Sequence, residues 1–181
     1  KNWRIVWRED FDETAAMTES ELRSIGVKCA SDDNQKSGEE PLPFQKEFSL
    51  AFTKTETCVN PNCDDFSDKV RSAAAALGLR VFGGGAYAAL DWFEEDDYNA
   101  FCEDGAKHQI GGYPDFTQSD MRREGDLLLF QMDSEFLTDE NGEQTGDEIL
   151  WGDMGIANFF IRAEDLERRD FSRALYNWDC Y

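Results

Sequence analysis

The hydrophobic positions of this chain are densest in its C-terminal third, where two apolar runs predict strands. Residues 126–133, DLLLFQMD, and residues 155–161, GIANFFI, are nearly continuous in apolar side chains. Short runs of this kind, bounded by polar turn formers, are typical of strands that are covered on both faces. We therefore predict that the two segments are antiparallel neighbours with a central place in a sheet.

The polar stretch between the two runs sets their predicted register. A fold-back near Asn141-Gly142, with the chain reversing at Gly142-Glu143, brings Asp133 and Asp153 close together at the loop end of the strands. Because side chains alternate along a strand, Leu127, Leu129, Ala157, Phe159 and Ile161 would share one face. The predicted opposite pairs are Gln131–Gly155, Leu129–Ala157 and Leu127–Phe159.

The rest of the chain predicts short elements of both kinds. The spacing of Thr18 and Glu21 is that of a capping box, which favours a helix ending at Gly26. Period-two alternation over residues 45–57 predicts a half-buried strand, and the glycine pair before Tyr113 predicts a tight turn. The remaining predictions are strands over 3–7, 80–91 (with a bulge at its three glycines) and 174–181, helices over 66–77, 91–104 and 163–170, and polar loops over 31–43 and 134–148. Together they predict a single α+β domain over 1–181, with a mostly antiparallel sheet and a few short helices.

The charge of the chain narrows the classes of partner. A formal net charge of −21 repels phosphate backbones and anionic lipids, so we expect no nucleic-acid and no membrane partner. The same field favours a basic protein partner or a cation. No run of 18 apolar residues is present, and residues 1–10 lack the features of a signal peptide, so we expect a cytoplasmic protein.

The five cysteines predict free thiols. Their number is odd and their spacing is scattered, which makes a poor disulfide framework. Cys58 and Cys63, in CVNPNC, have the spacing of half a zinc site, but no second pair is present and His108 is the only histidine. We expect no metal and no cofactor.

Five polar or aromatic residues are candidates for a site. His108 with the carboxylates of Asp133 and Asp153 would be the catalytic set, since two carboxylates at strand ends can hold a cation or exchange protons. Asp115, after the glycine turn, and Trp151, in the WGD stretch, are the binding candidates. The structural alternative is that these aspartates cap strand ends and accept hydrogen bonds from loop amides.

Four motifs in the same order resemble the YwqG-like family of bacterial domains of unknown function. They are HQIGGYPDFTQ, LLLFQMDSE, ILWGDMGIANFFIRAEDL and FSRALYNWDC, which span residues 108–180. Members of that family are usually longer, so the resemblance implies the C-terminal part of such a domain or a shortened relative. It also implies an α+β fold with a mostly antiparallel sheet, and it carries over no catalytic residues.

Two functions follow from these observations. The first is a non-enzymatic binding or protein-interaction module, because the chain is strongly acidic and has no catalytic constellation. Its finer form is an immunity-like domain that neutralises a basic protein. The alternative is a carboxylate-based hydrolase that uses Asp133 and Asp153 with His108. If a missing half normally covers the sheet, the chain would expose an apolar patch or associate with itself through an open strand edge.

Overall fold

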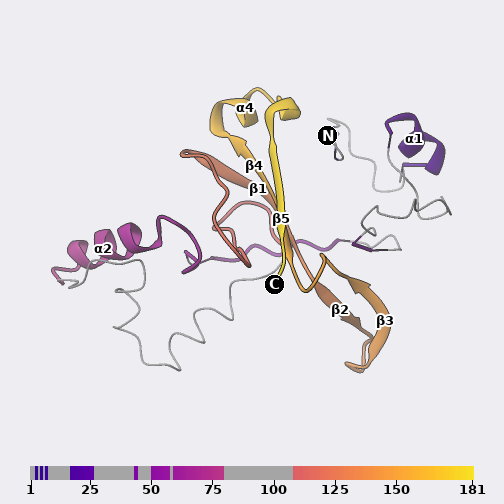
Figure 1. Cartoon of the computed structure of the whole chain (residues 1–181), viewed down its shortest axis with the longest axis horizontal. Coiled ribbons are helices and arrows are strands. Elements are labelled where there is room, and N and C mark those ends of the chain that lie inside the picture. Colours follow the sequence, from indigo (N-terminus) through magenta and orange to yellow (C-terminus); the bar gives the residue numbers. More distant parts are fainter. Residues whose placement is uncertain are drawn as a thin grey trace.

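The computed structural model describes Trp3, Ile5, Trp7 and residues 17–26, 43–44, 50–57, 59–79 and 108–181. Within these ranges the chain has an α+β fold, as predicted, with antiparallel strands and short helices. The strands form a three-stranded sheet in the order β1-β4-β5 and a separate two-stranded hairpin, β2–β3. The hairpin projects from one end of the larger sheet, and α4 lies at the other end (Figure 1). None of the described helices is both long and apolar enough to cross a bilayer.

The larger sheet is built from the two apolar runs and the C-terminal segment. Its strands are β1 (Asp126–Asp133), β4 (Ile156–Arg162) and β5 (Leu175–Asp179), and both pairings are antiparallel. The predicted pairing of β1 with β4 is confirmed. The predicted central place of β1 is wrong for the described strands, because β4 holds the middle and β1 an end.

The predicted register between β1 and β4 is also wrong. Leu127 pairs with Ile161 and Gln131 with Asn158, which is a slip of two residues that becomes three beyond an irregularity between Leu128 and Phe130. A bulge of this kind inserts one extra residue into one strand and re-aims the side chains that follow it. The hydrophobic pattern could not reveal that extra residue. Both faces of the strand are apolar, so a slip only exchanges one apolar set of side chains for another.

One face of the sheet packs against the N-terminal part of α2 (Phe66–Ala76) and the loops beside it, while the rest of the helix extends away from the sheet (Figure 1). Its core joins Leu128 and Phe160 from the strands to Cys63, Phe66 and Phe116. The N-cap of α2 is Asp65, and Gly78 beyond the end of the helix has a φ of 73°. The opposite face carries stacked aromatic rings.

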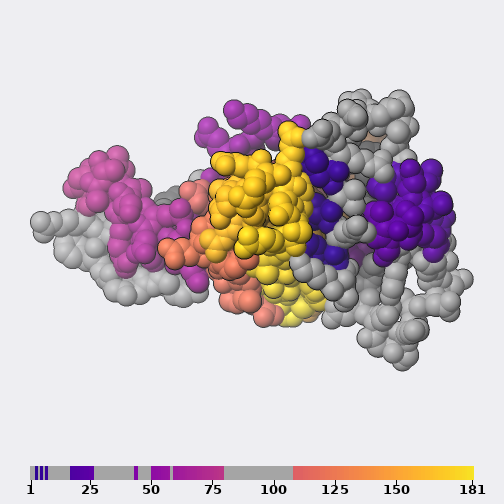
Figure 2. Space-filling model, turned by 90° about the horizontal axis from the view of Figure 1, so that it is seen from above, coloured from indigo at the N-terminus to yellow at the C-terminus, as the bar shows by residue number. Residues whose placement is uncertain are grey.

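The aromatic face also receives the N-terminal segment. Trp3 lies edge-on to Phe159 with ring centroids 5.9 Å apart, and Phe159 packs on Tyr176 at 4.8 Å. Trp7 stacks on Phe171 at 5.7 Å. Figure 2 shows these N-terminal residues (indigo) lying against the C-terminal strands (yellow). Trp3, Ile5 and Trp7, from the strand predicted over 3–7, therefore lie against the sheet, while the remaining residues of that predicted strand lie outside the described ranges.

The short elements largely follow the sequence. Helix α1 (Glu19–Ser24) has the predicted capping box of Thr18 and Glu21, α4 (Ala163–Glu167) opens the predicted 163–170 helix, and a single 3-10 turn spans Phe171–Arg173. Gly111 and Gly112 have φ of 70° and 76°, as a tight turn requires. A Cβ at Gly112 would lie 2.5 Å from Thr57 Oγ1, so the turn also allows a close approach of two segments.

Two predictions fail within the described ranges. Residues 134–148 are not a loop but the hairpin of β2 (Glu135–Thr138) and β3 (Gln144–Ile149), which turns at Asn141-Gly142. Residues 50–57 form no strand, and Leu50 and Phe52 are exposed rather than half-buried. The predictions over 31–42, 80–91 and 91–104 lie outside the described residues.

Candidate functional site

A cavity of about 1370 Å³ follows β1 along the sheet. The side of the cavity toward the aromatic face is apolar, and the side toward α2 is charged. The apolar lining includes Ile5, Trp7, Phe44, Leu127, Phe130, Met132, Trp151, Phe159, Leu166 and Phe171. The charged lining consists of Asp64, Asp65, Lys69, Asp120, Arg122, Arg123, Glu124 and Asp126. A hollow with one apolar and one charged wall suits an amphipathic ligand.

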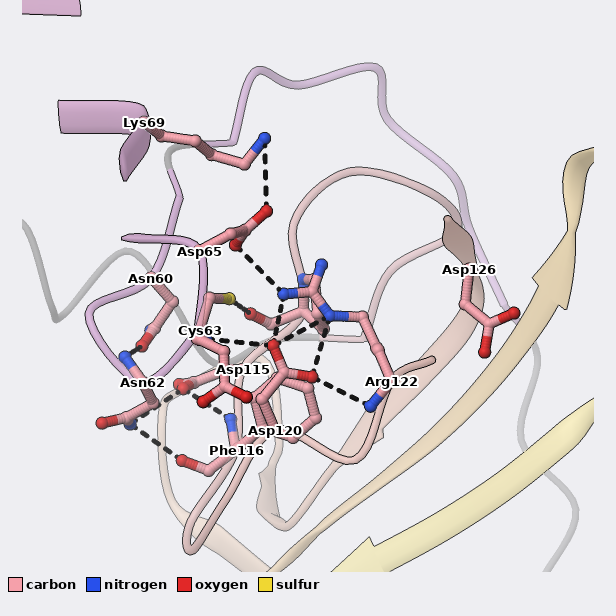
Figure 3. A network of polar contacts seen from close by, with 12 residues as sticks. Asn60, Asn62, Cys63, Asp65, Lys69, Asp115, Phe116, Asp120, Arg122 and Asp126 are labelled. Atoms are coloured by element: carbon pink, nitrogen blue, oxygen red, sulfur yellow. Dashed lines mark hydrogen bonds and ion pairs between the residues drawn. The ribbon is translucent and has the colours of Figure 1, made fainter. Parts of the chain in front are cut away.

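Arg122 organises the charged wall. Its guanidinium forms an ion pair with Asp120 and a second one with Asp65, at 3.2 Å between Nη2 and Oδ1. Asp65 in turn contacts Lys69, with 3.4 Å between Oδ2 and Nζ (Figure 3). The Asp120 carboxylate also accepts a hydrogen bond from the Asp64 amide, at 3.1 Å. This network ties the loop before β1 to the start of α2.

The same contacts fix the charge states of the network. Burial opposes ionisation of Asp120, but its hydrogen bonds from Arg122 and from the Asp64 amide outweigh burial and lower its pKa. The bond to Asp120 raises the pKa of Arg122 further above neutrality. Both groups are therefore ionised at neutral pH, and their ion pair helps to hold the loop before β1 against the start of α2.

Cys63 lies beside this network but is chemically quiet. Burial raises the pKa of its thiol to about 12, although the nearby Arg122 opposes the shift. Its Sγ donates to Pro114 O at 3.3 Å. Since the thiolate is the nucleophile and the metal ligand, a buried protonated thiol serves neither role at neutral pH.

One group of side chains has metal-ligand atoms close together. Atoms of Cys63, Asp65 and Asp120 lie within 4.8 Å of one another. Both carboxylates already bind Arg122, so a cation would have to displace a guanidinium and deprotonate the thiol. The group is better described as part of the ion-pair network around Arg122. Cys58, the partner of Cys63 in the zinc pattern, lies outside the described residues.

Asp115 is buried and holds two loops together. Its carboxylate accepts from the Phe116 amide at 2.7 Å and from Asn62 Nδ2 at 3.3 Å, and its backbone amide donates to Gln131 Oε1 at 2.8 Å. Burial raises its pKa more than these hydrogen bonds lower it. These contacts are those of a structural carboxylate, and its role in binding stays a prediction.

His108 and Asp133 lie together at the end of β1. The Asp133 amide donates to His108 Nδ1 at 3.1 Å, so the ring proton of a neutral His108 sits on Nε2, which lies 3.0 Å from Glu135 Oε2. Burial raises the pKa of Asp133, against its bond from the Ser134 amide and the nearby histidine. Two of the three catalytic candidates are thus brought together.

Asp153 lies on the other side of β4. It occupies an exposed turn whose carbonyl accepts from the Tyr181 amide at 3.3 Å, beyond β5, whereas Asp133 belongs to β1. Among the described residues, no hydrogen bond joins the Asp153 carboxylate to Asp133 or His108. The expected meeting of Asp133 and Asp153 depended on the predicted register, which is wrong by three residues at Asp133, where the partner is Ile156. A catalytic role for the three stays a prediction.

Trp151 lies on the apolar wall of the cavity. Its ring lies 6.4 Å from that of Tyr176 and 6.3 Å from that of Trp178. Its indole Nε1 is buried and has no hydrogen-bond partner among the described residues. A buried donor of this kind carries a desolvation cost until an acceptor reaches it. This sequence candidate for binding therefore lies at the cavity, and its role in binding stays a prediction.

Sequence reasoning missed Arg122 and its two carboxylate partners. Asp65 and Arg122 are 57 residues apart, so no local pattern announces their pairing. The available signal was the spacing of Asp120 and Arg122, whose side chains meet two residues apart just before a buried strand.

The class of protein defined by this fold and cavity is an α+β domain with a mostly antiparallel sheet and a hollow along one end strand. The profile of a domain of unknown function, DUF1963, matches residues 1–180. The chain therefore belongs to the DUF1963 family. The match reaches well beyond the four C-terminal motifs, while the YwqG-like name stays a prediction. No curated protein matches the chain.

Proposed function

We propose that this domain is a protein-interaction module that binds a basic protein through the β2–β3 hairpin. The observation that supports this proposal is the negative charge of the hairpin segment, residues 134–148, which we call the arm. Residues 134–148 contain six carboxylates, at positions 135, 139, 140, 143, 147 and 148, and no lysine or arginine. The arm projects from the sheet (Figure 1). Such a field attracts a basic surface and speeds encounter with it.

The hairpin also has an anchor for such a partner. Phe136 is 49% exposed and pairs across the hairpin with Glu148. Exposed aromatic side chains surrounded by charge are typical of interface centres, where they supply buried area at low entropic cost. The Asp139 carboxylate accepts from the amides of Asn141 and Glu143, at 2.8 and 3.0 Å, which holds the tip in one shape.

An immunity-like role is the finer form of this proposal. A domain that neutralises a basic protein would act by covering its cationic surface, which requires no catalytic group. The cytoplasmic location expected from the sequence belongs to the same proposal. The hydrolase alternative has one supporting contact, the pairing of His108 with the Asp133 amide, and it lacks Asp153 at that place.

The test is a salt-graded capture experiment with matched variants. The hairpin variant Glu140→Gln/Glu143→Gln/Glu148→Gln removes three exposed charges, and the control Glu56→Gln/Glu164→Gln/Glu167→Gln removes three exposed charges elsewhere. Wild type and control should retain the same basic proteins from a native lysate, and the hairpin variant should lose them. Retention that is insensitive to salt, or equal for both variants, would reject the proposal.

A further inference from the structure

The outer edge of β1 is largely unpaired within the described part of the chain. Among the described residues, only Gln109 pairs with it, through reciprocal backbone hydrogen bonds with Gln131 of 3.0 and 2.8 Å. The chain then turns away at Gly111 and Gly112. From Asp126 to Phe130, no described residue forms a ladder with this edge. Unpaired edges are templates for an added strand.

The cavity reaches both faces of β1 at this open stretch. Leu127 and Phe130 belong to the aromatic face, because Leu127 pairs with Ile161 and the Phe130 ring stacks on Phe159. Asp126 and Leu128 belong to the opposite face, since they pair with Arg162 and Phe160, and both also line the cavity. A hollow that touches both faces of one strand must pass around the edge of that strand. Leu127 is 45% exposed there.

The charged wall has unbalanced carboxylates. Lys69, Arg122 and Arg123 each pair with an aspartate, at 3.4 Å for Lys69–Asp65 and 2.8 Å for Arg123–Asp126. Asp64 and Glu124 are exposed, and neither side chain has a counter-ion among the described residues. The five lining carboxylates face three lining cations and Arg162, whose Nε lies 3.3 Å from Asp126 Oδ1, so the described wall keeps a net charge of −1. This wall attracts cations.

We propose that the open edge of β1 takes up an extended segment of a basic partner in which aliphatic and Lys/Arg side chains alternate. Side chains of an added strand point alternately to the two faces of the sheet. The aliphatic ones enter the apolar wall, beside Phe130 and Phe159. The basic ones meet Asp64 and Glu124 on the charged wall. This inference rests on the proposed function and names a second surface for the same partner.

The first experiment needs no variant. Three labelled seven-residue peptides, alternating Lys with Val, Lys with Ser and Glu with Val, are titrated against the whole wild-type chain by fluorescence anisotropy. We expect the Lys-Val peptide to bind at least tenfold more tightly than either of the others. Equal binding of the Lys-Val and Lys-Ser peptides would show attraction by charge alone and would overturn the strand proposal.

The second experiment locates the peptide. Leu127→Arg places a cation in the cavity, and Leu79→Arg makes the same change at a similarly exposed leucine beyond the C-terminal end of α2, away from the cavity and the hairpin. Binding of the Lys-Val peptide should weaken about tenfold in the first variant, the scale of one buried contact, and less than threefold in the second. Equal weakening would reject the site.

Hydrogen exchange separates the occupants. Added peptide should slow exchange over residues 126–130 of the wild-type chain. Protection that rises with protein concentration without peptide would show a second copy on the edge and would overturn the proposal. Failure of the proposed function looks different, because the hairpin variant would then retain basic proteins whatever the peptide does.

Discussion

Carboxylates at the charged wall and carboxylates on the hairpin have opposite roles in this protein. Asp120 and Asp126 are almost inaccessible, with side-chain exposures of 3% and 0%, and each is paired with arginine. Glu140, Glu143 and Glu148 are exposed on an arm that has no basic residue. Buried carboxylates must be compensated, because an isolated charge out of water is very costly. Exposed ones need no partner and remain available to another molecule.

The comparison also separates two sources of stability. The sheet face that packs on Phe66 and Phe116 has a hydrophobic core in contact with the ion pairs, since Arg122 lies over the Phe116 ring at 5.9 Å. The hairpin has only one fully buried apolar residue along its strands, Ile149. Changes in the first region should alter folding, and changes in the second should alter association.

The largest expected effect is the loss of a core ring. Phe160→Ala removes a side chain that is 0% exposed and should lower the free energy of unfolding by about 4 kcal/mol. Phe136→Ala, on the hairpin, should cost less than about 1 kcal/mol because half of that ring already meets solvent. Urea unfolding of both variants measures the difference. Similar costs would mean that the hairpin is part of the core.

The next effect is the loss of the central cation. Arg122→Met leaves the buried Asp120 carboxylate without its main partner and should cost about 3 kcal/mol. The exposed pair of Arg71 and Asp68, at 3.5 Å, is the matched control, and Arg71→Met should cost less than about 0.5 kcal/mol. If both variants unfold at the same urea concentration, the ion-pair network around Arg122 does not stabilise the fold.

The sequence predicted the first region better than the second. The apolar runs identified β1, β4 and their pairing, since strands covered on both faces must be rich in apolar residues. They could not identify the bulge near Leu129, because one extra apolar residue leaves the pattern apolar. The hairpin was missed because strands exposed to solvent on both faces have no hydrophobic period.

The candidate site was harder to predict because its parts come from distant segments. Asp133 and His108 are 25 residues apart and meet through a backbone amide, which no side-chain pattern encodes. Asp153 was assigned to the same place by a register that was wrong by two to three residues. Trp151 reached the cavity for a reason visible in the sequence, as part of the aromatic set that packs on the sheet.

Removing charges from the hairpin should have an effect of intermediate size, on association rather than on folding. The triple variant Glu140→Gln/Glu143→Gln/Glu148→Gln should weaken binding of a poly-lysine chain of about 20 residues by roughly tenfold at low salt, with little effect near 0.5 M salt. Its stability should stay within about 0.5 kcal/mol of wild type, because these side chains are exposed. Titration calorimetry and urea unfolding give the two readings. A large loss of stability would contradict the division between the regions.

The smallest expected effect concerns how stability depends on pH. The ionisation of two buried carboxylates, Asp120 and Asp115, should change the stability in opposite directions. The folded-state pKa of Asp120 is lowered, so its charge stabilises the fold above its unfolded pKa, and that stability is lost as pH falls through the folded value. The folded-state pKa of Asp115 is raised, so its ionisation destabilises the fold as pH rises through that value.

Asp120→Asn should therefore destabilise the protein at pH 7, and the loss of stability should shrink in acid. Asp115→Asn keeps an oxygen acceptor for the Phe116 amide and should be neutral or stabilising at pH 7, with that advantage lost in acid. Urea midpoints measured from about pH 3 to 7 for both variants give the two slopes. Parallel slopes would show that the two aspartates have similar environments, and the separation of Asp120 as a paired charge from Asp115 as a desolvated one would then be wrong.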